Sequence, residues 1–233
     1  MSNSKINESK KQYVVQYNVS RITREEKAKI LSSFPVFVGA DKEEVLQFAE
    51  NMRPKVIKPM EVFVEEGLDE YQAFFMYKGS ASLFRTTSEG EIVNIEVLGA
   101  PEIVGEMGLI DQQISPVSAV AISETHALTI SQESYCELIE KNPHFSNRLL
   151  KVFSSRIRYF DNYVEELVSS NLYERTWNML QYLSRVFPNR EIIMSHEELD
   201  NLIWGSRSRI TEVLNQMQRE GKVKLSHRKI KLL

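Results

Sequence analysis

The chain has 233 residues, of which 42% are hydrophobic and 26% charged, and its formal net charge at neutral pH is −3. This composition is typical of a globular protein, and the single cysteine excludes a disulfide framework or a cysteine-ligated iron–sulfur or zinc site within one chain. No apolar run is long enough to span a membrane, and residues 1–20 lack the apolar core of a signal peptide. We therefore expect a cytoplasmic protein with no membrane partner.

The charge is distributed unevenly along the chain. Residues 170–233 contain eleven Lys and Arg against seven Asp and Glu, a net charge of +4, whereas the residues before them carry −7. A basic segment joined to an acidic one favours contact between the C-terminal part and a polyanion. Chance variation is an equal alternative on charge alone.

The N-terminal half predicts a tail, two helices and a β-rich block. A polar tail at 1–22 precedes short helices at 23–34 and 40–52, the second with Asp41 as its N-cap. Short β-like runs then fill residues 53–130, and turn signals at roughly 8–12-residue spacing predict an antiparallel sandwich or barrel. The runs are separated by Gly67, Gly79, Gly90 and Gly99.

Residues 144–169 contain neither Gly nor Pro and predict one long helix. Their apolar positions alternate in steps of three and four, a heptad pattern that suits a partner helix. The positions are Leu150, Phe153, Ile157, Phe160, Val164 and Leu167. Packing of this stripe on the sheet of its own chain is the alternative. The narrow alternation favours homodimerisation.

The C-terminal segment predicts two short helices and a hairpin. Ser195 and Glu198 have capping-box spacing at the first helix, and Gly205 permits a tight turn before Ser206 caps the second. The second helix has one apolar face, made by Ile210, Val213, Leu214 and Met217. After Gly221, "VKLSHRKIKL" alternates like a small hairpin with basic residues at its turn. Together these parts predict a winged helix-turn-helix, which places its second helix in the DNA major groove.

The exposed residues of this segment have the chemistry of a DNA reader. We predict that Arg207 reads bases, because a guanidinium donates two hydrogen bonds to guanine. Arg209, Arg228 and Lys229 are better suited to phosphates. The other predicted contacts are Ser206, Ser208, Thr211 and Glu212. Solvated arginines on an ordinary helical pair are the alternative, and the basic hairpin favours DNA.

The order of these parts resembles the CRP/FNR family of bacterial transcription regulators, over about residues 25–233. "VFVEEGLDEYQAFFMYKGSASLF" is similar to the family's strand pair around a Gly-containing turn, "IVGEMGLI" to the start of its cyclic-nucleotide pocket, and "SRSRITEVL" to its recognition helix. The resemblance implies an α+β fold. It has an N-terminal antiparallel, jelly-roll-like β-roll with flanking helices, a long dimerisation helix and a C-terminal winged helix-turn-helix.

The resemblance also implies boundaries and partners. The tail covers 1–22, the β-roll 23–143, the dimerisation helix 144–169 and the DNA-binding domain 170–233. The implied function is that of a homodimer that binds a two-fold symmetric double-stranded DNA site and is not an enzyme. RNA polymerase is a further candidate partner.

The predicted effector pocket departs from the family pattern. Family members that bind cyclic nucleotides begin the pocket with a Gly-Glu pair, here Gly105 and Glu106, and place an arginine on the cyclic phosphate about ten residues later. In this sequence that place holds Ser115, Val117 and Ser118 and no basic residue. A buried phosphate would lack its charge-assisted partner. We therefore predict that cyclic AMP does not control this protein and that Glu106 is a structural turn residue.

No cofactor is predicted. The iron–sulfur version of the family needs several cysteines, and the spacing of His126, His144 and Cys136 does not indicate haem, although haem stays an alternative. Cys136 is interpreted as a small core residue rather than a redox switch. In the recognition helix, Ser208 and Glu212 stand where the family often has Glu and Arg, and this predicts an altered target sequence.

The alternative function is a β-roll that binds another protein and whose winged helix no longer reads DNA. Glu212 favours it slightly, because a carboxylate repels phosphate. Asp200 also favours it, since the family usually has a small residue at that place.

Overall fold

The computed structural model describes residues 22–68, 72–203 and 205–233, without the side chains of Glu166, Leu167, Pro188 and Arg207. The predicted tail at 1–22 lies outside the described residues except for Ile22. That side chain is only 8% exposed and belongs to the N-terminal core, so the folded part begins at least one residue earlier than predicted.

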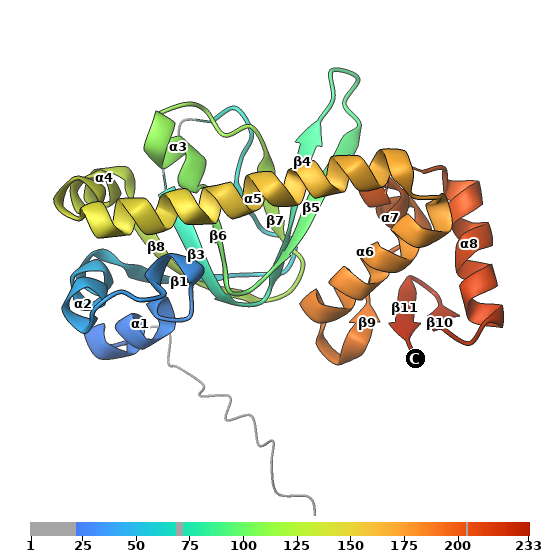
Figure 1. The fold of residues 1–233 in the computed structure, drawn as a ribbon, viewed down its shortest axis with the longest axis horizontal. Helices are drawn as coiled ribbons and strands as arrows, with labels where there is room; N and C mark the ends of the chain where they lie inside the picture. The colour runs from blue at the N-terminus through green and yellow to red at the C-terminus, as the bar shows by residue number, and fades with distance from the viewer. Residues whose placement is uncertain (1–21, 69–71, 204) are drawn as a thin grey trace, which may run out of the picture.

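Two α-helices precede the strands, as predicted (Figure 1). They are α1 (Arg24–Leu31) and α2 (Lys42–Asn51), joined through the 3-10 turn η2 (Pro35–Phe37). The Asp41 carboxylate accepts a hydrogen bond from the Glu44 amide at 2.8 Å, which confirms the predicted N-cap of α2.

The β-roll consists of two four-stranded antiparallel sheets. In spatial order the first contains β1 (Arg53–Ile57), β8 (Thr125–Ser131), β3 (Gln72–Lys78) and β6 (Glu102–Val104), and the second contains β2 (Val62–Val64), β7 (Ser118–Ala121), β4 (Ser80–Thr86) and β5 (Ile92–Gly99). Alternating side chains of both sheets form a buried layer that includes Ile57, Phe74, Met76, Leu98 and Ala119. The predicted antiparallel β fold with flanking helices is confirmed.

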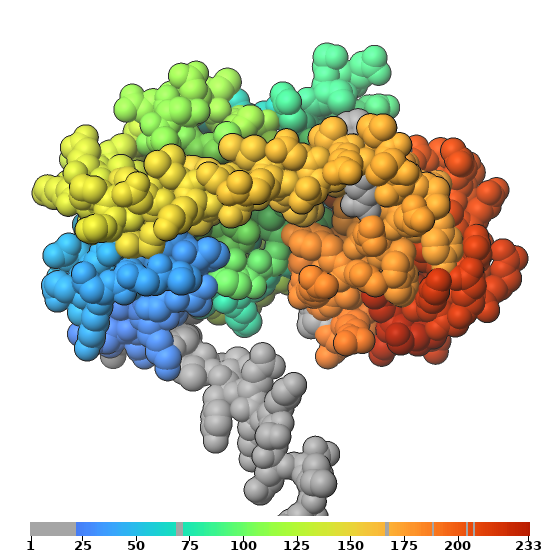
Figure 2. Space-filling model, viewed as in Figure 1, coloured from blue at the N-terminus to red at the C-terminus, as the bar shows by residue number. Residues whose placement is uncertain are grey.

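Helices cover the roll on one side. The short α3 (Glu106–Asp111) follows β6, and α4 (Gln132–Lys141) leads into α5 (Pro143–Ser169), which has 27 residues. α5 begins one residue earlier than predicted, because proline fits the first turn of a helix. It crosses the face of both the roll and the C-terminal domain (Figures 1 and 2). None of the described helices is long and apolar enough to cross a membrane.

The C-terminal domain has the predicted winged helix-turn-helix. It contains α6 (Leu172–Val186), the turn η3 (Pro188–Arg190), β9 (Glu191–Ile192), α7 (His196–Ile203), α8 (Arg207–Arg219), β10 (Val223–Ser226) and β11 (Lys229–Leu232). The two-residue β9 was not predicted; it pairs with β11 and extends the hairpin to a three-stranded sheet. The inward face of α8 is fully buried at Ile210, Leu214 and Met217, whereas Val213 is half-buried.

The C-terminal domain is docked on the β-roll. Val97 of β5 is 2% exposed and packs in the core of the C-terminal domain. The Tyr182 hydroxyl of α6 donates a hydrogen bond to the Val97 carbonyl at 2.8 Å. A Cβ on Gly99 would lie 3.1 Å from Val186, so the small residue at the end of β5 permits this close approach. The roll and the recognition helix therefore belong to one packed unit.

Candidate functional site

The polar face of α8 carries most of the predicted DNA contacts. Ser208, Arg209 and Glu212 are exposed, and Thr211 is half-buried. The side chain of Arg207 lies outside the described residues, but its backbone is the first residue of α8. Since the opposite face of the helix is buried, rotation of α8 about its axis is prevented, and these residues stay directed outward.

Ser206 occupies the N-cap position of α8, but its hydroxyl makes no capping hydrogen bond. The prediction that its side chain caps the helix is therefore wrong. The Ser206 hydroxyl lies 3.5 Å from the Ser208 hydroxyl instead, so it is drawn toward a neighbouring side chain rather than toward a backbone amide.

Hydrogen bonds begin α7 and hold it against α8. The predicted capping box at the start of α7 is confirmed: the Glu198 amide donates to the Ser195 hydroxyl at 3.1 Å, and the Ser195 amide donates to the Glu198 carboxylate at 2.6 Å. The contact between the two helices is made by His196 Nδ1, which lies 2.9 Å from the Thr211 hydroxyl. Thr211 therefore holds α7 as well as bordering the exposed face of α8.

The basic residues of the hairpin form ion pairs with acids of the same domain. Arg228 donates to both oxygens of Glu198 at 3.0 and 3.2 Å. Lys229 lies 2.6 Å from Glu191, and its ammonium lowers the pKa of that carboxyl. Lys231 pairs with the same carboxylate at 3.2 Å. Exposed pairs of this kind are worth little, so DNA phosphates can compete for the cations.

In the β-roll, the predicted Gly-Glu pair lies at the start of α3. Gly105 has φ +85°, and a Cβ there would be 2.5 Å from the Gln72 carbonyl oxygen, so both the conformation and the space require glycine. The Glu106 side chain is buried and forms an ion pair with Arg156 of α5. Glu106 thus connects the roll to the long helix.

Arg156 is surrounded by more than one acid. Its guanidinium also pairs with Glu102 at the start of β6 and donates to the Ile103 carbonyl at 3.2 Å. Burial, and then the charge of Glu102, raises the pKa of Glu96 of β5 to about 7. We call Glu96, Glu102, Glu106 and Arg156 the roll cluster. It places three carboxyl groups around one guanidinium.

The remaining predicted pocket residues are engaged in local backbone contacts. The Ser115 hydroxyl donates to the Val117 carbonyl at 2.7 Å. The buried Ser118 hydroxyl accepts from the Glu66 amide at 3.0 Å. These residues support the loop beside β2, and they bring no cation to it.

Known proteins show both domains of this architecture. A model of the cyclic nucleotide-binding domain matches residues 54–142. The cyclic AMP receptor protein of Thermus thermophilus is 29% identical over 192 residues, which cover 82% of this chain and 88% of that protein. The solved c-di-GMP responsive regulator CLP of Xanthomonas campestris has a TM-score of 0.68 at 19% identity and covers 82% of this chain and 99% of its own.

A solved regulator assigned to the CRP/FNR family in Eubacterium rectale has a TM-score of 0.69 at 19% identity, with 86% of this chain and 94% of that chain covered. Over most of its length the chain is similar to CRP-type regulators, and residues 54–142 match the cyclic nucleotide-binding domain. These relatives are transcription regulators rather than enzymes. The resemblance seen in the sequence is thereby confirmed.

The long helix α5 has an apolar stripe that the fold of the single chain leaves uncovered. We call this stripe the α5 seam. Its members are Leu150, 62% exposed, Ile157, 62%, Phe160, 50%, Val164, 57%, and Val168, 85%. Phe153 differs from them, because its ring is half-buried and packs against the N-terminal core of its own chain; its place at a dimer interface stays a prediction. The side chain of Leu167 lies outside the described residues.

Among the residues considered for haem or redox chemistry, His126 and Cys136 make separate local contacts. His126 Nε2 lies 2.9 Å from Glu124, and Cys136 Sγ lies 3.5 Å from the Leu109 carbonyl oxygen, where it is half-buried. Within the described part of the chain, no group of three or more His, Cys, Asp or Glu side chains is placed to hold a metal ion.

The roll cluster makes stability depend on pH. Because the folded-state pKa of Glu96 is raised to about 7, the folded state binds more protons than the unfolded chain from about pH 5 upward. The free energy of unfolding therefore falls as pH rises from about 5 to 8, by about 2 kcal/mol for this group. We expect Glu96→Gln to remove most of that fall, measured by urea unfolding across this pH range.

Glu89→Gln is the matched control for that experiment, since Glu89 is exposed on the turn between β4 and β5. It should keep the slope of the unmodified protein. An unchanged slope in Glu96→Gln would place the excess proton on another group of the roll.

Proposed function

We propose that this chain is a homodimeric transcription regulator that binds a two-fold symmetric DNA site and does not require cyclic AMP. The observation that carries the proposal is the exposed polar face of α8, held outward by the buried Ile210 and Leu214 and adjacent to a basic hairpin. A helix presented in this way fits the major groove, and the hairpin is placed to contact the flanking backbone.

The α5 seam supports a dimer. A long helix with an exposed apolar stripe at heptad-like spacing gains stability when a second copy covers it. Two copies related by a two-fold axis along α5 would present two α8 helices to half-sites about one helical turn apart. RNA polymerase is a further partner in this proposal, with no contact residues assigned.

The charge of the roll cluster supports independence from cyclic AMP. The sequence offers no arginine in the phosphate-binding turn, and the nearby Arg156 is already paired with Glu102 and Glu106. A phosphate buried beside Glu106 would meet its carboxylate and a guanidinium that is already paired. Its desolvation would not be compensated. Gly105, Glu106, Ser115, Val117 and Ser118 then keep a structural role in a β-roll that has lost nucleotide control. No haem or other cofactor is included.

A second candidate function, binding of another protein by a module that no longer reads DNA, draws support from the hairpin. Arg228 forms an ion pair with Glu198, and Lys229 forms one with Glu191. The cations expected to contact DNA phosphates are therefore already paired with carboxylates of the same domain. Glu212 adds a further carboxylate on the exposed face of α8.

Selection from a random duplex pool tests the proposal. We expect the purified protein to enrich a two-fold symmetric site equally well with and without cyclic AMP. Affinity for that site should fall steeply with salt, because phosphate contacts release counterions. Enrichment only with cyclic AMP would overturn the nucleotide part, and no enrichment at all would favour the second candidate.

Arg207→Ala is expected to weaken binding to the selected site by about tenfold to a hundredfold and to relax the preference at one base pair of each half-site. Arg158→Ala, on the exposed surface of α5, is the control and should leave the affinity unchanged. An equal loss of DNA affinity in the two variants would show that Arg207 does not read bases.

A further inference from the structure

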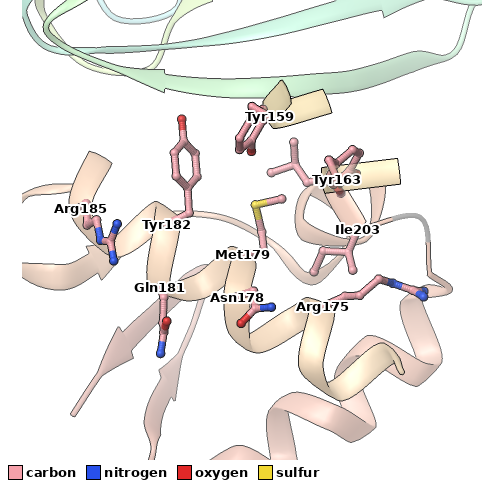
Figure 3. Close-up of a pocket in the computed structure, with 10 residues that line it drawn as sticks. Tyr159, Tyr163, Arg175, Asn178, Met179, Gln181, Tyr182, Arg185 and Ile203 are labelled. Carbon is pink, nitrogen blue, oxygen red and sulfur yellow. Dashed lines mark hydrogen bonds between the residues drawn. The ribbon is translucent and has the colours of Figure 1, made fainter. Parts of the chain in front are cut away.

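A cavity of about 330 Å³ lies between α5 and the C-terminal domain (Figure 3). α5 contributes Tyr159 and Tyr163, and the end of α7 contributes Leu202 and Ile203. The α6 side carries Arg175, Asn178, Met179, Gln181, Tyr182 and Arg185. We call this space the interdomain cavity. Its size is at the lower end of the range for small-molecule sites.

The chemistry of the lining favours an anion. The lining has two guanidinium groups, two carboxamides and three phenols, but no carboxylate. Arg175 and Arg185 lie at opposite ends of the α6 wall, with Met179 between them (Figure 3). Arg185 is exposed and forms no ion pair within the part of the chain that the structure describes. A guanidinium without an acid can pair with an incoming carboxylate or phosphate.

The same cavity suits a flat ring. Met179 lies at its centre, the buried Leu202 and Ile203 supply an apolar wall, and tyrosine rings supply faces for stacking. Because Arg185 has no ion pair among the described residues, we place the acidic group at the Arg185 end and the ring against Met179.

We propose that the interdomain cavity binds a small aromatic anion, a planar ring with one carboxylate or phosphate group, and that its occupancy alters DNA binding. The second part rests on the proposed function. The Tyr163 hydroxyl donates to the Leu202 carbonyl at 2.8 Å, so α5 contacts the end of α7 immediately before the turn to α8. A ring inserted beside Tyr163 changes the position of α7, and with it α8, relative to α5.

Fluorescence titration with anilinonaphthalene sulfonate, whose planar naphthalene ring carries one sulfonate group, tests the site on the full chain. We expect saturable binding that Arg185→Gln weakens about tenfold, the loss expected for one charge-assisted contact. Arg158→Gln is the matched control, because Arg158 is an exposed arginine of α5 outside the cavity. Equal binding by both variants, or no saturable binding by the unmodified protein, would overturn the proposal.

Competition distinguishes the anion from the ring. Phenyl phosphate and benzoate should displace the dye, and their relative strengths identify phosphate or carboxylate as the preferred group. Phenol, which has the ring without the charge, should displace it at least about tenfold less well. Equal displacement by phenol would show that the site recognises apolar surface alone and would contradict an anion site.

The regulatory part has its own readout. With the DNA site found by selection, saturating dye should change the affinity of the unmodified protein by about fivefold or more and that of Arg185→Gln much less. If the dye binds through Arg185 but DNA affinity is unchanged, the cavity is a binding site without control of α8. If no DNA site exists, the proposed function fails while the titration still tests the cavity.

Discussion

Arg156→Ala is expected to lower the free energy of unfolding by about 3 kcal/mol at neutral pH, because it leaves a buried carboxylate without its cation. Glu106 is 5% exposed and is paired by Arg156, the same guanidinium also pairs with Glu102, and its charge acts on Glu96. Without it, three carboxyl groups remain together at the contact between the roll and α5. Urea unfolding followed by circular dichroism measures the change.

The pH dependence separates this effect from a loss of packing. Burial raises the pKa of Glu106 and Arg156 opposes that rise, so Glu106 in the variant takes up a proton more readily. We expect the destabilisation by Arg156→Ala to be smaller at pH 5 than at pH 7. Arg158→Ala, two residues away on the exposed surface of α5, should cost less than about 0.5 kcal/mol. Similar small losses in both variants would contradict the role of the roll cluster.

The elements that the sequence predicted well are those specified by local spacing. The capping box at Ser195 and Glu198, the buried face of α8 and the alternation of β10 and β11 each depend on residues within one or two helical turns or one hairpin. The short β runs between residues 53 and 130 predicted the individual strands in the same way, whereas the pairing of the strands is not local, since Arg53 of β1 lies opposite Thr129 of β8. Local hydrogen bonding and the period of burial specify single elements.

The electrostatic pairs could not be predicted in this way. Arg156 is fifty residues from Glu106, and Arg228 is thirty residues from Glu198, so no spacing rule joins either pair. The sequence has no arginine near Ser115 that could bind a phosphate. Nothing in its spacing indicates that the guanidinium of Arg156 reaches the β-roll from α5 and pairs with acids there.

Phe153 shows the limit of heptad reasoning. Its spacing fits the apolar stripe, but the long helix has apolar residues on two adjacent faces. The face that includes Phe153 packs against the N-terminal core, while Ile157 and Val164 remain exposed. A sequence stripe gives the width of the apolar surface and not the division of that surface between the same chain and a partner.

Replacing Ile157 and Val164 together with aspartate is therefore expected to convert the protein to a monomer without unfolding it. Both side chains are more than half exposed in the single chain, so the substitutions remove little packing, whereas two copies would bring four carboxylates together at the α5 seam. Sedimentation velocity measures the assembly. Affinity for a two-fold symmetric DNA site should fall by about a hundredfold or more, because one α8 contacts only one half-site.

The pair Ser155→Asp and Asn162→Asp provides the matched control. Both residues are exposed, and at 3.6 residues per turn they lie on the side of α5 opposite Ile157 and Val164. This control adds the same charge and should remain dimeric. Dissociation of both variants would indicate a general effect of charge on the helix. A seam variant that stays dimeric and folded would show that two copies meet elsewhere, and the exposed stripe of α5 would then need a different partner.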